Sequence, residues 1–248
     1  MQIFSPLEQF EIVPIFKLTG DLFTITNSTV FGLLAVGTTS FFLYLVTTQP
    51  TIVPNRWQSL AESLYSFVFD NCIKDVLAEK GNRYFPFIFT TFLFILSCNL
   101  FGMIPYTFTL TSHLAVTFGL GLATFIGINI IAFREHGLHF FSFFLPKGAP
   151  IALAPMLVVI ELISYIFRVM SLSIRLFANM MAGHTLLKIL AGFAWMMLSA
   201  GGLIATASVF PVVVVVALTG LEFAIAFLQA YVWVVLVCIY LQDAINLH

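Results

Sequence analysis

Hydrophobic residues in this chain follow one another in long runs that contain no charged side chain. The residues between Asp21 and Arg56 include no Asp, Glu, Lys or Arg. A helix needs ~20 consecutive apolar residues to cross the hydrocarbon of a bilayer, and this run is longer than that. It predicts a transmembrane helix over about 28–46, which ends before Pro50 and Pro54 because proline cannot continue a helix.

A second uncharged run extends from Tyr84 to Phe133 and is long enough for two spans. Pro105 lies near its middle, in a stretch where a turn would join two helices. We therefore expect a transmembrane hairpin over 84–133.

Polar and apolar positions alternate with helical spacing between 55 and 82. Apolar residues recur at intervals of three and four, and charged residues occupy the other side of the predicted helix. This pattern is typical of an amphipathic helix that lies on the membrane surface. The apolar positions are Trp57, Leu60, Ala61, Leu64 and Val68, and the charged ones are Arg56, Glu62, Asp70, Lys74, Asp75, Glu79 and Lys80.

The last hundred residues contain two longer apolar stretches, over about 154–190 and 206–247, which we expect to form a pair of long helices within 149–248. At about 1.5 Å per residue, a helix of ~40 residues extends ~60 Å. The hydrocarbon is only ~30 Å thick, so each helix must be steeply tilted or broken. Length alone does not choose between the two.

Composition supports a membrane protein. Of the 248 residues, 60% are hydrophobic and only 8% are charged, and the mean hydropathy is +1.06. The predicted fold class is therefore an all-α polytopic membrane protein with a single membrane domain, 1–248. A net charge of -1 offers no basic surface, which argues against a nucleic-acid partner. The sequence has no glycine-rich phosphate loop such as GxxxxGK[ST], which argues against nucleotide binding.

The three cysteines, Cys72, Cys98 and Cys238, are scattered without CxxC spacing. This predicts packed free thiols rather than a zinc site or a disulfide framework. We expect no metal, no cofactor and no catalytic residue in this chain.

Lysine and arginine are concentrated in two of the connections. They lie in 56–83 and return at Arg134 and Lys147, whereas the 105–112 connection has neither. The positive-inside rule places the first two connections on the inner side, so the N-terminal segment, 1–27, is expected outside. The acidic residues of that segment, which argue against a cleavable organellar presequence, are Glu8, Glu11 and Asp21.

Arg175 is the most costly residue in the chain, because it lies in an apolar run that would suit the middle of a bilayer. An arginine there costs at least ~2.5 to 3.5 kcal/mol and cannot shed its proton. Burying such a charge for packing alone is too expensive. Arg175 is therefore expected to face a partner, a water-filled cavity, or both.

Other polar side chains accompany Arg175 in the last two helices, and they occur at matching levels. If the two helices form an antiparallel hairpin, the two residue numbers of any pair at the same level add up to nearly the same sum. Three polar pairs meet this condition: Glu161 with Asp243, Arg175 with Gln229, and His184 with Glu222. The first pair would lie toward the inner side and the last toward the outer side. This order suits two offset half-channels separated by a charge that cannot titrate.

Helical phase tests this arrangement in part. At ~100° per residue, Glu161, Arg168, Arg175 and Asn179 stay within ~40° of one face of their helix. Glu222, Gln229 and Asp243 likewise share a face of the last helix. His184 does not follow Arg175, because it lies ~180° away on a straight helix. Either the helix bends near Gly183 or His184 serves a cavity on another face.

Each of these residues also has a structural explanation. Asp243 could simply reach the headgroups from the helix end, and Glu161 with Arg168, seven residues apart, could form a structural ion pair. Gln229 could only hold two helices together. His184 could be a packed histidine or, less plausibly, a haem ligand, because it is the one histidine deep in the membrane.

The stretches SLSIRLFANMMAGHTLL and LEFAIAFLQAYVW, with the opening SPLEQFEI, resemble subunit a of the F-type ATP synthases, in its fungal mitochondrial form. The resemblance covers nearly the whole chain, and the pattern RLFAN-x-x-AGH is highly specific. Bacterial relatives commonly have an acidic residue where His184 stands and a histidine where Glu222 stands. The exchanged arrangement in this chain is similar to the mitochondrial branch.

The resemblance implies one upright span, an amphipathic helix on the matrix side, a spanning hairpin and two long tilted helices that pack against a rotating ring of c subunits. It favours tilt over a break. The implied partners are the c ring, the other membrane-sector and peripheral-stalk subunits, protons and the lipid bilayer. The implied location is the mitochondrial inner membrane, with multiple spans.

The resemblance also implies roles for individual residues. The arginine that matches Arg175 faces the proton-carrying carboxylate of the ring, which belongs to another chain. His184 and Glu222 would belong to the half-channel from the intermembrane space, and Glu161 and Asp243 to the matrix half-channel. Polar residues that flank the essential arginine would be Asn179, Gln229 and Arg168.

Two other classes of protein remain possible from the sequence. A secondary transporter, or a proton-path subunit of another membrane pump, would need its own complete ion path and usually an internal repeat, and we find neither. A structural membrane scaffold would tolerate replacement of Arg175 by leucine.

Overall fold

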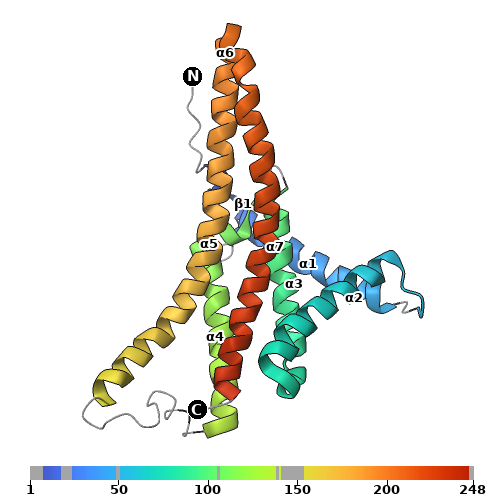
Figure 1. Cartoon of the computed structure of the whole chain (residues 1–248), viewed down its shortest axis with the longest axis vertical. Coiled ribbons are helices and arrows are strands. Elements are labelled where there is room, and N and C mark those ends of the chain that lie inside the picture. Colours follow the sequence, from blue (N-terminus) through green and yellow to red (C-terminus); the bar gives the residue numbers. More distant parts are fainter. Residues whose placement is uncertain are drawn as a thin grey trace. The chain divides into compact units, whose positions relative to one another are not determined.

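The chain is an all-α polytopic membrane protein in its computed structural model (Figure 1). The structure describes residues 8–17, 24–48, 51–104, 107–137, 140 and 154–245. Within them, five helical segments are long and apolar enough to cross a membrane. These segments are Asn27–Thr48, Phe85–Gly102, Leu114–His136, Pro155–Ala200 and Ile204–Ile245.

The helices have the following bounds. The first spanning helix, α1, is Asn27–Thr48. The polar stretch after it forms α2, Arg56–Val68. This helix continues as the π-helical η2, Phe69–Leu77, and then as the 3-10 helix η3, Ala78–Arg83. The predicted hairpin forms α3, Phe85–Gly102, and α4, Leu114–His136, with the short 3-10 helix η4, Leu110–Ser112, between them. The last three helices are α5, Ala154–Ala200, α6, Gly202–Ala207, and α7, Val209–Ile245.

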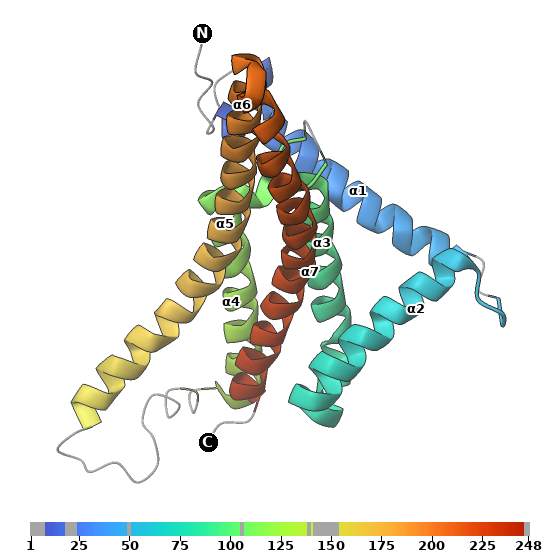
Figure 2. The same cartoon turned by 45° about the horizontal axis from the view of Figure 1, so that its top comes forward.

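The two long helices are continuous (Figure 2). Helix α5 has 47 residues and α7 has 37, so at about 1.5 Å per residue they extend ~70 Å and ~55 Å. Both exceed the ~30 Å thickness of the hydrocarbon. Of the two alternatives left by the sequence, a break and a steep tilt, the continuous helices favour tilt.

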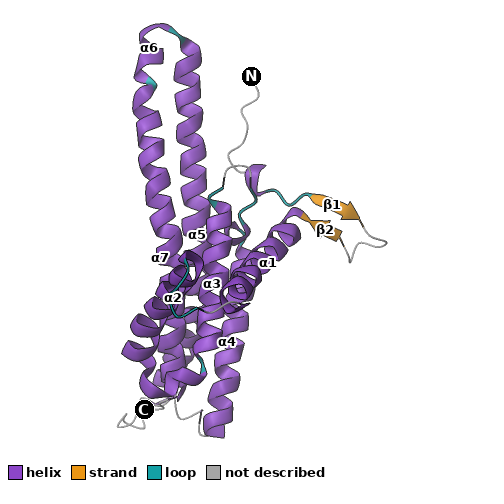
Figure 3. Ribbon diagram, turned by 90° about the vertical axis from the view of Figure 1, so that its right-hand side faces the viewer, coloured by secondary structure: helices purple, strands orange, loops and turns teal. Residues whose placement is uncertain are grey.

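A short β-ribbon near the N-terminus is an element that the sequence analysis did not predict (Figure 3). Strand β1, Pro14–Lys17, pairs antiparallel with β2, Thr24–Thr26, with an irregularity after Pro14. A single turn of 3-10 helix, η1, Glu8–Phe10, precedes the ribbon. The ribbon leads directly into α1.

The described residues form two compact units, which are treated separately. Unit 1 comprises Met1–Ser40, Phe94–His113 and Leu176–Ala230, and unit 2 comprises Phe41–Leu93, Leu114–Arg175 and Tyr231–His248, in each case as far as the structure describes them. Unit 1 contains η1, the ribbon, most of α1, and the parts of α5 and α7 joined by α6. Unit 2 contains α2, α4, the first half of α3, and the remaining parts of α5 and α7, and the second half of α3 belongs to unit 1.

A buried asparagine fixes α7 within unit 1. Asn99 on α3 is 0% exposed, and its Nδ2 donates a hydrogen bond of 3.1 Å to the backbone oxygen of Ala226. An amide in an apolar interior is costly unless it is bonded, so this contact ties α3 to one position along α7. Ala226 lies one turn beyond Glu222. The contact therefore helps to position the part of α7 that carries Glu222.

The core of unit 2 is formed by the polar stretch, by the first half of α3 and by α7. Of the apolar positions predicted for 55–82, Ala61 and Val68 are buried within the protein, whereas Trp57 and Leu60 are 62% and 47% exposed, so their predicted contact with the membrane surface stays a prediction. Burial continues along η2, and the switch to π-helical turns alters the phase of the buried positions there. The buried residues of this core include Cys72, Ile73, Leu77, Ile88, Phe92, Trp233, Val237, Cys238 and Leu241. All three cysteines are free and buried, as the spacing predicted.

Candidate functional site

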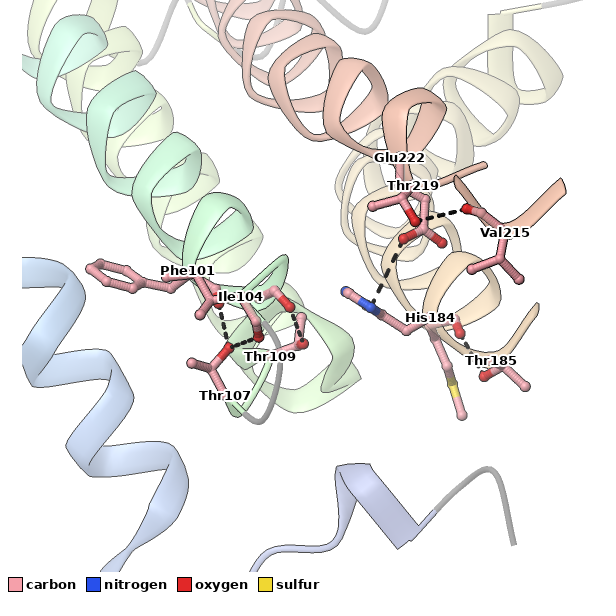
Figure 4. A network of polar contacts seen from close by, with 11 residues as sticks. Phe101, Ile104, Thr107, Thr109, His184, Thr185, Val215, Thr219 and Glu222 are labelled. Atoms are coloured by element: carbon pink, nitrogen blue, oxygen red, sulfur yellow. Dashed lines mark hydrogen bonds and ion pairs between the residues drawn. The ribbon is translucent and has the colours of Figure 1, made fainter. Parts of the chain in front are cut away.

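The structure brings His184 and Glu222 together across unit 1. His184 lies on α5 and Glu222 on α7, and Figure 4 shows the two side chains facing one another. The distance from Nδ1 of His184 to Oε2 of Glu222 is 4.0 Å, which is too long for a direct hydrogen bond. The side chains are only 15% and 12% exposed. The pairing inferred from matching levels is therefore present in the structure.

Glycine at position 183 creates the room that Glu222 occupies. A Cβ atom at Gly183 would lie 2.4 Å from Oε1 of Glu222 and 3.0 Å from its Cδ. Such distances are far below van der Waals contact, so any larger residue at 183 must displace the carboxyl group. Gly183, which precedes His184 in the sequence, therefore leaves space for the carboxyl group that His184 faces.

A polar cavity of about 240 Å³ adjoins this pair within unit 1. Its wall includes both side chains, together with threonines on α7 and on the turn after α3. Two buried atoms of the pair, Nε2 of His184 and Oε2 of Glu222, make no hydrogen bond to any residue that the structure describes. Buried polar atoms normally have a protein or water partner, so these two are suited to water or to a transferred proton. The full set of lining residues is Gln9, Phe10, Gly102, Met103, Ile104, Thr107, Thr109, His184, Leu187, Thr219 and Glu222.

Two explanations remained for the position of His184: a bend of α5 near Gly183, or a cavity on another face of the helix. Helix α5 is continuous through Gly183, and His184 lines a cavity together with Glu222. Arg175, on the same helix, is exposed and does not line this cavity. These observations favour the explanation in which His184 serves a cavity that Arg175 does not line.

Unit 2 carries a second cluster, in which Arg168 bridges two acids. Nη1 of Arg168 donates a hydrogen bond of 3.0 Å to Oδ2 of Asp243 on α7. Its Nη2 lies 3.7 Å from Oε1 of Glu161, two turns earlier on α5. The ion pair between Glu161 and Arg168 that the sequence left as a structural alternative is thus present. The sequence did not predict that Arg168 would also contact Asp243.

Aromatic side chains surround the guanidinium of Arg168. Its Cζ lies 5.4 Å from the ring centre of Tyr240 and 6.0 Å from that of Tyr165, within the range of cation–π attraction. The hydroxyl of Tyr165 donates a hydrogen bond of 2.7 Å to Oδ1 of Asn129 on α4. Sequence analysis missed Tyr165, Tyr240 and Asn129, because single polar groups in apolar helices gave no pattern that distinguished them from packing residues.

Arg175 has a different environment from Arg168. It is exposed, and it makes no hydrogen bond or ion pair with any residue that the structure describes. Its predicted neighbour on α5, Asn179, is exposed as well, while Gln229 on α7 is half-buried. Arg175 and Gln229 belong to different units, so their pairing stays a prediction.

Known proteins resemble this chain over almost its whole length. The family model described as ATP synthase A chain matches residues 29–242. ATP synthase subunit a of Chondrus crispus is 55% identical over 248 residues, covering 99% of this chain and 98% of the relative. The subunit a of Marchantia polymorpha is 53% identical, covering 98% and 99%, and that of Rhodospirillum rubrum is 49% identical, covering 98% and 99%. On this evidence the chain belongs to the ATP synthase A chain family.

Proposed function

We propose that this chain is the proton-translocating subunit of the membrane sector of a rotary ATP synthase, and that it contains no catalytic site for nucleotide chemistry. The observation that carries the proposal is the His184–Glu222 pair, whose buried polar atoms face a polar cavity inside an apolar bundle. Titratable residues at membrane depth are costly and usually mark ion or proton paths. The pair is therefore assigned to the half-channel from the outer side.

The second cluster is assigned to the half-channel from the inner side. Glu161 and Asp243 are half-buried acids held near one another by Arg168. Glu161 is 35% exposed and its contact with Arg168 is long, so it can exchange a proton without breaking a hydrogen bond. Asp243 is bonded at 3.0 Å, which suits a residue that fixes Arg168 in place.

Arg175 is assigned the role of the fixed charge between the two proton paths. On α5 it follows Arg168 by seven residues and precedes His184 by nine. An exposed arginine on a membrane helix is costly unless a partner covers it, and the partner proposed here is a carboxylate on a ring of c subunits. Asn179 and Gln229 flank this position as polar residues.

A mechanism follows from the charge of Arg175. A ring carboxylate that reaches it is held ionised, because a nearby positive charge favours the charged form of an acid. Protons must then load from one half-channel, travel through lipid on neutral ring carboxyls and leave through the other. Each charge that falls through 100 mV releases ~2.3 kcal/mol, which biases the rotation in one direction.

We place the chain in the mitochondrial inner membrane, with the N-terminal segment on the intermembrane-space side and the Arg56–Arg83 connection on the matrix side. Its partners are the c ring and the other membrane-sector and peripheral-stalk subunits. A transporter would carry both halves of its ion path in one chain, whereas here the carrying carboxylate is supplied by another subunit.

Glu222→Gln tests the role of the outer pair. The amide fills the same space as the carboxyl group but cannot exchange a proton, so we expect ATP-driven proton pumping to fall at least about tenfold, which corresponds to ~1.4 kcal/mol in the barrier. The complex should remain assembled, and passive proton leak should not rise. Pumping at the rate of the unsubstituted complex would contradict the assignment.

A further inference from the structure

The N-terminal segment forms part of the wall of the cavity that holds His184 and Glu222. Gln9 and Phe10, from the single turn η1, line this cavity together with residues from α3, α5 and α7. These two residues lie more than 90 positions before the other lining residues in the sequence. Nothing in the local pattern of the segment indicates such a contact, so only the fold reveals it.

Hydrogen bonds hold this segment to the start of α1. The side chain of Asn27 donates from Nδ2 to the backbone oxygen of Glu11, at 3.0 Å, and accepts at Oδ1 from the backbone N–H of Val13, at 3.3 Å. The backbone N–H of Asn27 in turn donates to the oxygen of Val13, at 3.2 Å. Three bonds from one residue, followed directly by the β-ribbon, give the segment a defined position.

Most of the other polar groups in the cavity wall are hydroxyls that already donate a hydrogen bond to a backbone oxygen. Thr219 donates to the backbone oxygen of Val215, at 2.8 Å, and Thr107 donates to that of Ile104, at 2.7 Å. Figure 4 shows Thr219 beside Glu222, and Thr107 on the opposite, α3 side. Toward the cavity these hydroxyls can therefore only accept hydrogen bonds. The amide of Gln9 adds N–H donors as well as an acceptor, so it can orient water in a way that these threonines cannot.

We propose that the segment Glu8–Val13 is the outer wall of the proton path to Glu222, and that the Gln9 side chain lies on that path and positions its water. Glu8 and Glu11 are exposed on the same segment, and their negative charges favour cations near it. The inference rests on the function proposed above, because it assumes that protons reach Glu222 through this cavity. It makes Gln9 a positioning residue that exchanges no proton itself.

Cysteine substitution tests the proposal in the assembled complex. The three cysteines of this chain are buried, so they contribute little background reaction with a thiol reagent. We would compare Gln9→Cys, Thr219→Cys and Ile12→Cys after treatment with a negatively charged, membrane-impermeant methanethiosulfonate. Ile12 is the matched control, because it is 50% exposed on the same segment but does not line the cavity.

The expected result is a several-fold loss of proton transport after modification of Gln9→Cys and of Thr219→Cys, with no loss for Ile12→Cys. If modification slows proton transport only in Thr219→Cys, protons use the cavity but the N-terminal segment does not form a wall of their path. That result overturns this inference alone. If neither cavity position is slowed, the assignment of the cavity itself fails. Equal slowing of modified Ile12→Cys would also overturn the inference.

A second comparison separates chemistry from packing at Gln9. Gln9→Leu keeps most of the volume but removes the amide, and it should slow proton transport several-fold. Gln9→Asn retains the amide on a shorter side chain and should recover most of the rate. Equal rates for the leucine and glutamine forms would show that the amide has no part in proton access.

Discussion

At the scale of single residues, the most constrained contact is the one between Gly183 and the carboxyl group of Glu222. The absence of a side chain at 183 lets the acid approach α5, and the next residue, His184, faces it at 4.0 Å. Proton transfer depends steeply on such distances, and a misplacement of about 1 Å can cost ~100-fold in rate. One hydrogen atom in place of a methyl group therefore decides the geometry of the pair.

Gly183→Ala should lower ATP-driven proton pumping by about ten- to a hundredfold, because its Cβ displaces the Glu222 carboxyl group. Gly192→Ala is the matched control, since it lies on the same helix and its Cβ would meet nothing within 4 Å. The measurement is acidification of vesicles that contain the assembled complex. Equal pumping by the two variants would contradict the role given to Gly183.

Arg168 illustrates a different residue-scale effect, because one guanidinium is shared unequally between two acids. Its contact with Asp243 is 3.0 Å and its contact with Glu161 is 3.7 Å, and all three side chains are partly exposed. Solvent screens the charges of such partly exposed ion pairs, so each pair contributes only modestly to the free energy of unfolding. The shorter, hydrogen-bonded contact should still be the stronger of the two.

Double-mutant cycles should show this inequality. We expect a coupling free energy of about 1 kcal/mol between Arg168→Gln and Asp243→Asn, and close to zero between Arg168→Gln and Glu161→Gln. The free energies come from thermal unfolding of the detergent-purified complex. A stronger coupling to Glu161 than to Asp243 would overturn the separation of roles between the two acids.

At the scale of elements, α4 and α5 approach closely at Gly121 within unit 2. A Cβ there would lie 2.3 Å from Oγ of Ser173 and 3.4 Å from Cγ1 of Val169. Ser173 is fully buried and its hydroxyl donates to the backbone oxygen of Val169, so it has little freedom to move. Small residues of this kind let membrane helices pack at short distance.

Gly121→Ala should destabilise this contact by about 1 to 3 kcal/mol, the usual cost of adding a methyl group to a packed interior. The loss is measured as the fall in the unfolding temperature of the purified complex. Gly119→Ala, two positions earlier on the same helix, has no atom within 4 Å of its Cβ and should leave that temperature unchanged. A similar fall in both variants would mean that helix propensity, rather than packing, dominates.

Long uncharged runs were sufficient to predict the elements that cross the membrane. Uncharged runs and their bounding prolines placed the first helix at 28–46 and the hairpin at 84–133, close to the helices observed. The β-ribbon was missed because its strands have only four and three residues and lack an alternating pattern. The π-helical turns of η2 were also missed, since apolar spacing assumes a regular helix.

Less of the candidate site followed from the sequence. The His184–Glu222 pair was predicted because, on two antiparallel helices, residues at the same level have residue numbers that add up to nearly the same sum. When long helices curve, residue numbers do not show which side chains face one another across the two helices. The contact of Arg168 with Asp243 was therefore not predicted. Gln9 was missed for a further reason: its place in the cavity wall depends on the fold of a segment distant in sequence.

At the scale of the whole molecule, the chain has an unusual balance of charge. Only 8% of its residues are charged, yet several lie on the apolar helices α5 and α7. Arg168 has acidic partners within unit 2, whereas exposed Arg175 has no hydrogen-bond or ion-pair partner in the described part of the chain. A membrane scaffold would gain nothing from such an arginine. We therefore propose that its partner lies in another subunit.

The branch of the family is a further property of the whole chain. The His184–Glu222 arrangement and the opening residues favour the fungal mitochondrial form, which stays a prediction. The relatives compared above include proteins from Chondrus crispus, Marchantia polymorpha and Rhodospirillum rubrum, at 49% to 55% identity. Family membership does not depend on that choice.

Arg175→Ala tests the central claim most directly, through ATP synthesis driven by a proton gradient in membranes that contain the assembled complex. Arg134→Ala, which removes an exposed arginine from the end of α4, is the control and should synthesise ATP normally. We predict that Arg175→Ala abolishes synthesis while the complex assembles in normal amount, because ring carboxyls could then pass the subunit still protonated. Synthesis at the unsubstituted rate by Arg175→Ala would contradict the account.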